Sequence, residues 1–225
     1  MIYEHAVNAR AAAVHERFAD QLCPPGYMLA GGTALALHLG HRESDDLDFM
    51  TPMPPDLSKV VQRLEEAIPG LALTDRSEFS VHGLIDDVRV SYLWQRGVRL
   101  EVGGHWGSTP IASVPTLTAL KCNAIAGRGS KRDFIDVYAL LQSGVSFDEV
   151  LETASTYAPS LNRSHLLRAC LYFEDADKEP MPRLYHDWAW DDVKSTFRAV
   201  VPAYMRRHLP DLPERSDPPT RGLSR

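Results

Sequence analysis

Two glycines and two aspartates carry the strongest chemical signal in this chain of 225 residues. Gly31 and Gly32 precede a short apolar stretch, and Asp46 and Asp48 follow it. Because glycine has no Cβ atom, the N–H groups of such a turn can approach phosphate oxygens closely. A helix that begins there also directs its positive end at them. We therefore expect Gly31, Gly32 and the following Thr33 to bind the phosphates of a nucleotide.

The aspartates lie in a segment that alternates polar and apolar residues, which is typical of a strand. On such a strand Ser44, Asp46 and Asp48 share one face, while Leu47 and Phe49 can enter the core. Two neighbouring carboxylates repel each other, and a hard divalent cation that prefers oxygen ligands relieves the repulsion. We therefore predict that Asp46 and Asp48 bind Mg²⁺, which would bridge nucleotide phosphates and orient an attacking hydroxyl for in-line displacement.

Each of these signals also has a purely structural interpretation. A glycine pair before a helix is often only a tight turn, and the D-x-D pattern occurs by chance in surface strands. Here both features occur together, with one short helix between the glycines and the acids. The combination favours the active site of a nucleotidyltransferase.

A second group of chemically active residues lies further along the chain. Apolar residues recur at helical spacing over residues 115–128, and Lys121 and Arg128 share one flank of this expected helix. Lys121 can reach a nucleotide phosphate from there, although a lysine whose stem lies along the core edge has the same pattern.

The next expected helix begins near Ser130 and places Asp133 and Asp136 on one face. Asp133 lies in the first turn, where an aspartate can also serve the helix dipole. Asp136 lies further in. We expect it to face the cleft, where it would orient the attacking hydroxyl, pair with Lys121 or help to hold a metal ion.

These stretches together resemble the AbiEii/AbiGii-type toxin family of nucleotidyltransferases, within the polymerase-β-like superfamily. The resemblance rests on residues 31–49, on the lysine motif at residues 120–125 and on the D-x-x-D motif within residues 128–138. It covers about residues 27–141, and the order and spacing of the motifs match.

The resemblance implies a role for each matching residue. Ser44 and Asp46 match the family's S-x-D pair, Lys121 its lysine, and Asp133 and Asp136 its later aspartates. The implied catalytic set is Asp46, Asp48, Lys121, Asp133 and Asp136, and the implied nucleotide-binding set is Gly31, Gly32, Thr33, Ser44, Lys121 and Arg128.

The implied activity is transfer of a nucleoside monophosphate from a nucleoside triphosphate (NTP) to RNA, notably the 3′ end of tRNA. The resemblance further implies a toxin of a toxin–antitoxin or phage-defence system, with a cognate antitoxin as its partner.

One position departs from the superfamily pattern, which usually adds a third carboxylate on a neighbouring strand. The segment at residues 88–91 has Ser91 at this place. Glu101 could substitute if its strand pairs next to the first one, and Asp133 or Asp136 could also fill the gap. A site with two carboxylates favours one tightly bound metal ion over two.

The composition is that of an ordinary globular protein, with 44% hydrophobic residues and three scattered cysteines. No apolar run approaches the length of a membrane helix, and the N-terminus lacks a signal-peptide pattern. We therefore expect no membrane partner and a cytoplasmic location.

The net charge of −6 argues against nucleic-acid binding through overall electrostatics. Contact with RNA must therefore be local, and Arg42, Arg128, Lys131 and Arg132 could form a basic patch at the cleft. His41 and Arg42 are also placed to contact phosphate or substrate.

The expected fold class is α+β, a polymerase-β-like core with a mixed sheet followed by a C-terminal helical bundle. We expect a nucleotidyltransferase core over residues 1–112, a helical region closing the cleft over residues 113–210, and a disordered tail over residues 211–225. Expected strands are residues 27–30, 44–49, 71–74, 79–84, 88–94 and 98–102. Expected helices outside the motifs are residues 6–22, 57–68, 146–157 and 164–173.

Two other functions are compatible with these residues. The enzyme could modify a small hydroxyl-bearing molecule or a protein side chain, which the acidic net charge favours. Alternatively, the chain could be a nucleotide-binding module that has lost catalysis, as Ser91 suggests. The motifs recognise the triphosphate shared by all four nucleotides, so they do not select the base.

Overall fold

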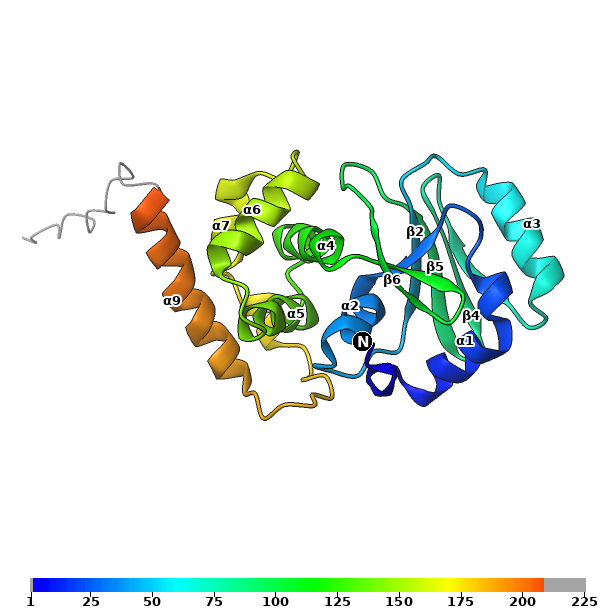
Figure 1. Ribbon diagram of the computed structural model, residues 1–225, viewed down its shortest axis with the longest axis horizontal. Coiled ribbons are helices and arrows are strands. Elements are labelled where there is room, and N and C mark those ends of the chain that lie inside the picture. The colour runs from blue at the N-terminus through cyan, green and yellow to red at the C-terminus, as the bar shows by residue number, and fades with distance from the viewer. Residues whose placement is uncertain (1, 209–225) are drawn as a thin grey trace, which may run out of the picture.

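The computed structural model describes residues 2–208, and within this range the strands form one seven-stranded sheet (Figure 1). The strand order is β3-β4-β5-β2-β1-β7-β6. The bounds are Met28–Ala30 for β1, Leu47–Thr51 for β2, Ala72–Arg76 for β3, Ser80–Ile85 for β4, Val88–Trp94 for β5, Val102–Trp106 for β6 and Thr109–Ala112 for β7. The sheet is mixed, because β2 runs parallel to β5 and antiparallel to β1.

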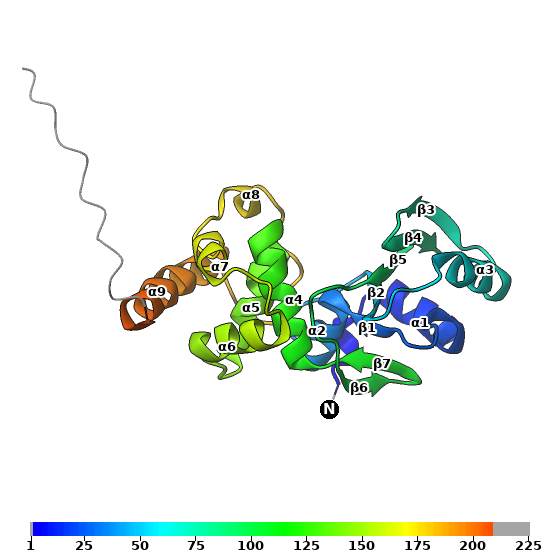
Figure 2. The ribbon, with the colours of Figure 1, turned by 90° about the horizontal axis from the view of Figure 1, so that it is seen from above.

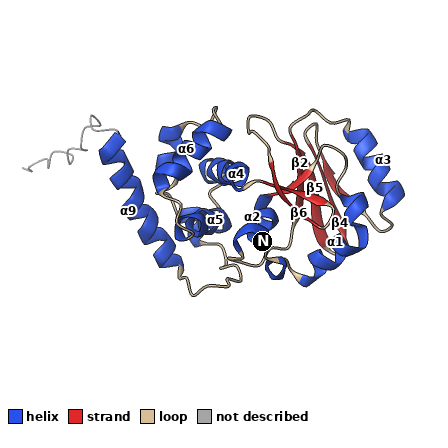
Figure 3. Cartoon of the chain, in the orientation of Figure 1, coloured by secondary structure: helices blue, strands red, loops and turns tan. Residues whose placement is uncertain are grey.

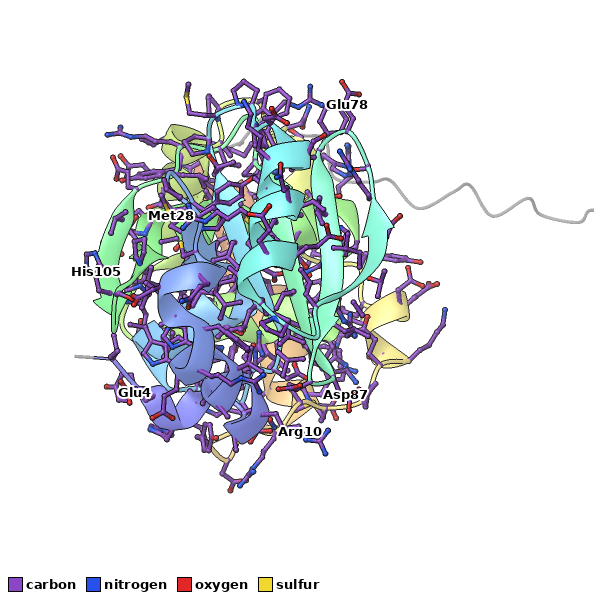
Figure 4. All side chains as sticks on the ribbon, turned by 90° about the vertical axis from the view of Figure 1, so that its right-hand side faces the viewer. Glu4, Arg10, Met28, Glu78, Asp87 and His105 are labelled. Atoms are coloured by element: carbon purple, nitrogen blue, oxygen red, sulfur yellow. The ribbon has the colours of Figure 1, made fainter. Side chains whose placement is uncertain are left out.

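Two helices cover one face of this sheet. They are α1, Ala9–Leu22, and α3, Leu57–Ala67, and Figure 4 views the molecule from their side, with Glu78 and Asp87 marking the two ends of β4. A short 3-10 helix, η1, spans Glu4–Ala6. As expected from the alternation, Leu47 and Phe49 are fully buried, and they belong to the core cluster that includes residues of α1 and α3. The acids of the same segment point to the opposite face.

The helix α2, Gly31–Leu39, lies between the sheet and a bundle of C-terminal helices, which Figures 2 and 3 show beside the sheet. These helices are α4 Val114–Gly127, α5 Lys131–Gln142, α6 Phe147–Tyr157, α7 Arg163–Ala169, α8 Glu174–Asp177 and α9 Trp190–His208. They share a second hydrophobic cluster that includes Phe134, Phe173 and Phe197. Trp190 is partly buried and packs edge-on against the first two of these rings, at the border of the bundle core.

Several helices begin where the sequence provides a side-chain acceptor for free backbone N–H groups. Asn8 caps α1, Asp56 caps α3, Ser113 caps α4 and Asn162 caps α7. Ser146 and its partner three residues later form a complete capping box at α6. Local sequence thus fixes these helix starts close to their predicted positions.

The loop between α2 and β2 is held from two sides by distant parts of the chain. On one side Ser44 bridges to Val7, near the N-terminus. On the other side Arg42 bridges to Leu184, which precedes α9. The loop that leads to both predicted metal-binding aspartates is therefore clamped between the start of the chain and its C-terminal third.

One predicted strand needs correction, and two observed elements had no predicted bounds. The strand expected at residues 98–102 lies instead at Val102–Trp106, because Arg99 donates its backbone N–H to Tyr157 of α6 and leaves the sheet. The strand β7 was not predicted, since Pro110 cannot donate to a ladder and weakens the strand pattern. The long helix α9 lies within the helical region expected at residues 113–210, although no bounds were predicted for it, and it contains Pro202. The expected tail at residues 211–225 lies outside the described residues.

The predicted fold class is confirmed: the chain has a mixed sheet with flanking helices and a helical bundle after it. None of the helices within residues 2–208 combines the length and apolar character needed to span a membrane.

Candidate active site

A cavity of about 510 Å³ lies between the polar face of the sheet and the helices α4 and α5. Its walls contain eight of the ten predicted catalytic and nucleotide-binding residues: Gly31, Gly32, Ser44, Asp46, Asp48, Lys121, Arg128 and Asp133. The remaining lining residues are Arg42, Met50, His82, Arg89, Ser91, Leu93, Gln95, Leu120, Asn123, Ala124, Ser130 and Arg132. The tertiary structure thus brings the glycine turn, the paired aspartates and the lysine motif to one place.

Asp48 lies directly over the glycine turn. Gly31 has a φ of +65°, and a Cβ atom at this position would lie 2.5 Å from Oδ2 of Asp48. Glycine is therefore required here twice, for the left-handed backbone and for the close approach of the carboxylate. Within residues 2–208 no side chain or backbone group donates a hydrogen bond to Asp48, so its carboxylate is free to accept a ligand in the cavity.

Asp46 lies at the cavity wall just before β2, and Arg89 of β5 approaches it with Nε 3.6 Å from Oδ1. Burial raises the pKa of Asp46, the neighbouring carboxylates of Asp45 and Asp48 raise it further, and Arg89 opposes them. This is the electrostatic signature of a carboxylate that lacks sufficient positive charge nearby. A cation bound between Asp46 and Asp48 would supply it.

Thr33 and Ser44 both hold the loop that leads to Asp46, and of the two only Ser44 lines the cavity. The hydroxyl of Thr33 contacts Ser44 Oγ at 2.9 Å and also donates to the backbone carbonyl of Asp46. Thr33 is fully buried and does not line the cavity, so its predicted contact with phosphate is wrong. Its position ties α2 to the loop that presents Asp46.

Asp136 is completely buried, and the expectation that it faces the cleft is wrong. Its carboxylate accepts hydrogen bonds from Arg42 Nε at 2.7 Å and Nη2 at 3.0 Å, and its Oδ2 lies 2.6 Å from Lys121 Nζ. Burial by itself would raise the pKa of Asp136, but Arg42 and Lys121 outweigh it and hold that pKa well below its ordinary value. The expected pairing with Lys121 is present, whereas an orienting contact with substrate is excluded by this burial.

His41 and Arg42 also differ from expectation. His41 is buried against Asp136, with Nε2 2.7 Å from Oδ1, and burial lowers the pKa of this histidine. Neither residue is exposed enough to reach a phosphate from solution, although Arg42 forms part of the cavity floor beneath Gly32.

Lys121 of α4 lies between two carboxylates of α5. Nζ of Lys121 is 3.0 Å from Asp133 and 2.6 Å from Asp136, because a spacing of three places both aspartates on one helix face. Asp133 also accepts hydrogen bonds from Arg128 and from the Ser130 hydroxyl. Burial would raise the pKa of Asp133, but Lys121 and Arg128 lower it. Asp133 therefore binds side chains, and it also lies in the first turn of α5, where its charge favours the helix dipole.

The predicted basic patch is divided by the fold. Arg128 and Arg132 line the cavity and have largely or half-exposed side chains. Lys131, by contrast, is buried and bonds Glu179, and Arg42 is buried under the glycine turn. Two of the four predicted cations are thus available to a ligand.

Ser91, which stands where the resemblance implies a third carboxylate, is the register partner of Asp48 in the parallel pair of β2 and β5. Glu101 cannot replace it. Glu101 precedes β6 at the far edge of the sheet, where it bonds Tyr157 and Arg99.

The sequence interpretation missed His82 and Arg89. Both lie on the cavity face of their strands: His82 follows Ser80 by two residues in β4, and Arg89 precedes Ser91 by two residues in β5. The alternation of apolar Val81 and Ile85 with polar neighbours in β4 was the signal that could have indicated His82.

The donor set fits one hard divalent cation. Asp46 and Asp48 offer carboxylate oxygens, which such ions prefer. Within residues 2–208 no group of three or more histidine, cysteine, aspartate or glutamate side chains is arranged to hold a metal ion. A cation held by Asp46 and Asp48 would therefore take its other ligands from substrate or water.

The mixed sheet, the glycine turn at a helix start and the paired carboxylates define a nucleotidyltransferase. Solved structures share this fold. MenT4, a nucleotidyltransferase toxin from Mycobacterium tuberculosis, is 16% identical with a TM-score of 0.54, over 89% of this chain and 88% of MenT4. JHP933 from Helicobacter pylori is 18% identical with a TM-score of 0.50, over 89% of this chain and 94% of JHP933.

Sequence comparison defines the family. The model of the family described as "Nucleotidyl transferase AbiEii toxin, Type IV TA system" matches residues 12–104, which contain Gly31, Asp46, Asp48 and Ser91. An uncharacterized protein of Aquifex aeolicus is 31% identical over 185 residues, which are 80% of this chain and 88% of that protein. The chain belongs to the AbiEii family of nucleotidyltransferase toxins, and it is an enzyme of that class.

Proposed function

We propose that this enzyme transfers a nucleoside monophosphate from an NTP to RNA, with the 3′ end of tRNA as the acceptor. One observation carries the proposal: the cavity joins a phosphate-type glycine turn, the carboxylates of Asp46 and Asp48, and three accessible arginines. These groups supply, in order, a phosphate site, a cation site and a local positive surface for a nucleic-acid strand.

The triphosphate would lie at the start of α2. The nine-residue α2 begins at Gly31 with its free N–H groups at the cavity, and anions are favoured at such a helix end. Arg128 and Lys121 add positive charge at the opposite wall. Lys121 has two of its three N–H groups engaged by aspartates, so one remains for a phosphate oxygen.

Asp46 and Asp48 would hold Mg²⁺. When bound, the ion neutralises charge on the phosphates and orients the two reactants. The chain's own groups hold the nucleotide still and keep its α-phosphorus open to the acceptor hydroxyl, which forms the new P–O bond as pyrophosphate leaves.

The RNA acceptor would enter over Arg128 and Arg132. Contacts of this kind depend on local cations, since the net charge of −6 disfavours binding by the whole surface. We further propose a role as the toxin of a toxin–antitoxin or phage-defence system, with an antitoxin partner and a cytoplasmic site of action.

We also propose a functional division of the chain. Residues 1–112 would form the nucleotidyltransferase core and residues 113–210 the helical region that closes the cleft. The two main hydrophobic clusters support this boundary, since one centres on the sheet and the other on α4 to α9.

The test is incubation of the purified protein with total tRNA, Mg²⁺ and each labelled NTP separately. We expect label in RNA with at least one NTP and no label with Asp46→Ala, because the variant lacks a metal-binding carboxylate. Asp45→Ala is the matched control, since Asp45 is exposed and, among residues 2–208, forms its one ion pair with Arg132.

Each other outcome changes the proposal in a defined way. Pyrophosphate release without labelled RNA would move the acceptor to a small molecule or a protein hydroxyl. Absence of triphosphate binding with or without Mg²⁺ would indicate a module that has lost catalysis.

A further inference from the structure

We propose that His82 and Ser91 form a proton relay that serves the acceptor hydroxyl during nucleotide transfer. The inference rests on the proposed transfer reaction and deepens it, because it assigns the group that takes the proton. The starting observation is that both side chains line the cavity, although neither is part of the glycine turn, the paired aspartates or the lysine motif.

The relay residues form one row across the sheet. Asp48 on β2 is the register partner of Ser91 on β5, and Ser91 is the register partner of His82 on β4. Directly paired residues of adjacent strands project from the same face of a sheet. The row therefore runs along the cavity floor and ends at the carboxylate beside the glycine turn.

The two side chains are hydrogen-bonded. Nδ1 of His82 lies 3.1 Å from Ser91 Oγ, and Nε2 of His82 lies 3.1 Å from Ser80 Oγ. With the ring proton on Nε2, the imidazole donates to Ser80 and its Nδ1 accepts the hydroxyl proton of Ser91. The oxygen of Ser91 then has lone pairs available for a second hydroxyl in the cavity.

This arrangement can replace a carboxylate base. A serine hydroxyl alone is too weak a base to accept a proton at neutral pH, whereas a neutral imidazole accepts one readily. In the relay, the attacking oxygen bonds to the α-phosphorus and the bond to pyrophosphate breaks. The proton of the attacking hydroxyl passes to Ser91 Oγ as the proton of Ser91 passes to His82 Nδ1, and the imidazolium later releases it to water.

The charged groups around His82 come from three strands. Asp75 of β3 is the register partner of His82 on its other side. Arg89 lies on β5 two residues from Ser91, and Asp46 and Asp48 lie on or beside β2. The pH dependence of the relay must therefore be separated from that of the carboxylates, which paired variants can do.

The experiment compares RNA labelling and pyrophosphate release across pH 5.5 to 8.5, within and above the range where imidazole titrates. His82→Asn and Ser91→Ala are expected to lower the rate at neutral pH by about 10²-fold, the usual contribution of a proton acceptor. In both variants the rate should also depend less on pH in the acidic range than it does in the wild-type protein. The control His105→Asn alters an exposed histidine on the outer strand β6, labelled in Figure 4, and should change neither quantity.

A rescue distinguishes the relay from a structural role. Ser91→Asp supplies a carboxylate that accepts the proton directly, so adding His82→Asn to Ser91→Asp should cost less than threefold in rate. If His82→Asn alone keeps the wild-type rate and pH profile, or if Ser91→Asp does not relieve its effect, the relay is overturned.

A second measurement does not use the reaction. Imidazole ¹⁵N spectra of the full chain should show the Nδ1 signal of His82 shifting in Ser91→Ala, and an unchanged signal overturns the hydrogen-bonded pair. If the proposed function is wrong, the wild-type protein neither labels RNA nor releases pyrophosphate. If only the relay is wrong, the wild-type protein is active and Asp48→Asn is inactive.

Discussion

The carboxylate of Asp136 accepts two hydrogen bonds from the guanidinium of Arg42, although the two residues are 94 positions apart in the chain. Arg42 belongs to the loop that leads to Asp46, and Asp136 belongs to α5 of the bundle. Both side chains are almost completely buried. The pair therefore fixes the loop between α2 and β2 against the helices that form the opposite wall of the cavity.

Removing the negative charge of Asp136 should lower the free energy of unfolding. In Asp136→Asn, the cations of Arg42 and Lys121 stay buried with too little negative charge, and breaking a buried pair in this way costs roughly 3–5 kcal/mol. Urea unfolding at neutral pH measures the loss. Asp86→Asn is the control, because its pair with Arg17 is exposed and worth less than about 1 kcal/mol. Equal stabilities of the two variants would contradict the assigned role of Asp136.

The glycine turn can be tested by adding one methyl group. Gly31→Ala would place its Cβ against Oδ2 of Asp48, so we expect transfer activity to fall at least tenfold as the carboxylate moves. Gly26→Ala is the control, since Gly26 also has positive φ, +82°, but nothing lies within 4 Å of the new atom. Both variants bear the backbone strain, and only the first displaces Asp48. Similar activities would show that the position of Asp48 is unimportant.

The effect of Mg²⁺ on nucleotide binding should depend on Asp48 and not on the exposed Asp45. We expect Mg²⁺ to strengthen binding of a non-hydrolysable NTP analogue, and Asp48→Asn to remove at least tenfold of that effect, because one of two ligand carboxylates is lost. Asp45→Asn should retain it. Calorimetric titration with and without Mg²⁺ measures both, and an equal Mg²⁺ effect in all three proteins would exclude Asp48 as a ligand.

The stability of the fold should fall in mild acid because of His15. Its ring stacks on Trp106, its Nε2 lies 2.8 Å from Thr109 Oγ, and burial lowers its pKa to about 4. The unfolded chain binds this proton below about pH 6.5, whereas the folded protein binds it only near pH 4. Stability is therefore lost as the pH falls from about 6.5 towards 4, by roughly 1–3 kcal/mol.

Urea unfolding of wild type and His15→Gln at pH 7 and pH 4.5 tests this assignment. The stability advantage of the wild type should shrink at the lower pH, since the variant has no imidazole to protonate. His41, whose pKa burial also lowers, contributes equally to both proteins and cancels in the difference. A constant advantage at the two pH values would remove His15 as the cause.

RNA affinity should depend on Arg132. Its pair with Asp45 is long, at 3.4 Å, and half-exposed, so Arg132→Ala should leave stability within about 1 kcal/mol of the wild type. If Arg132 contacts an RNA phosphate, the slope of log affinity against log salt should fall by roughly 0.7–0.9. Arg17→Ala, on the outer helix α1, should keep the slope. Equal slopes for both variants would move the RNA path away from Arg132.

Local sequence predicted much of the sheet and many of the helices. Alternation located β5 at its observed bounds, and apolar spacing placed the starts of α4 and α6 within one residue of where Ser113 and Ser146 cap them, because these features depend on neighbours in the chain. The hydrophobic face of residues 47–49 was predicted for the same reason. Strand β7 was missed, because its pairing with β1 rests on distant residues and Pro110 weakens its own pattern.

The sequence by itself determined which residues carry chemistry: the glycine turn, the paired aspartates and the lysine and aspartate motifs, whose types and spacing are local properties. Only the tertiary structure decided which of them share a cavity. It buried Asp136 and Arg42 together, since a buried charge needs a partner and the nearest one comes from a distant helix. It also set His82 beside Ser91, because strand register places side chains from separate strands in one row.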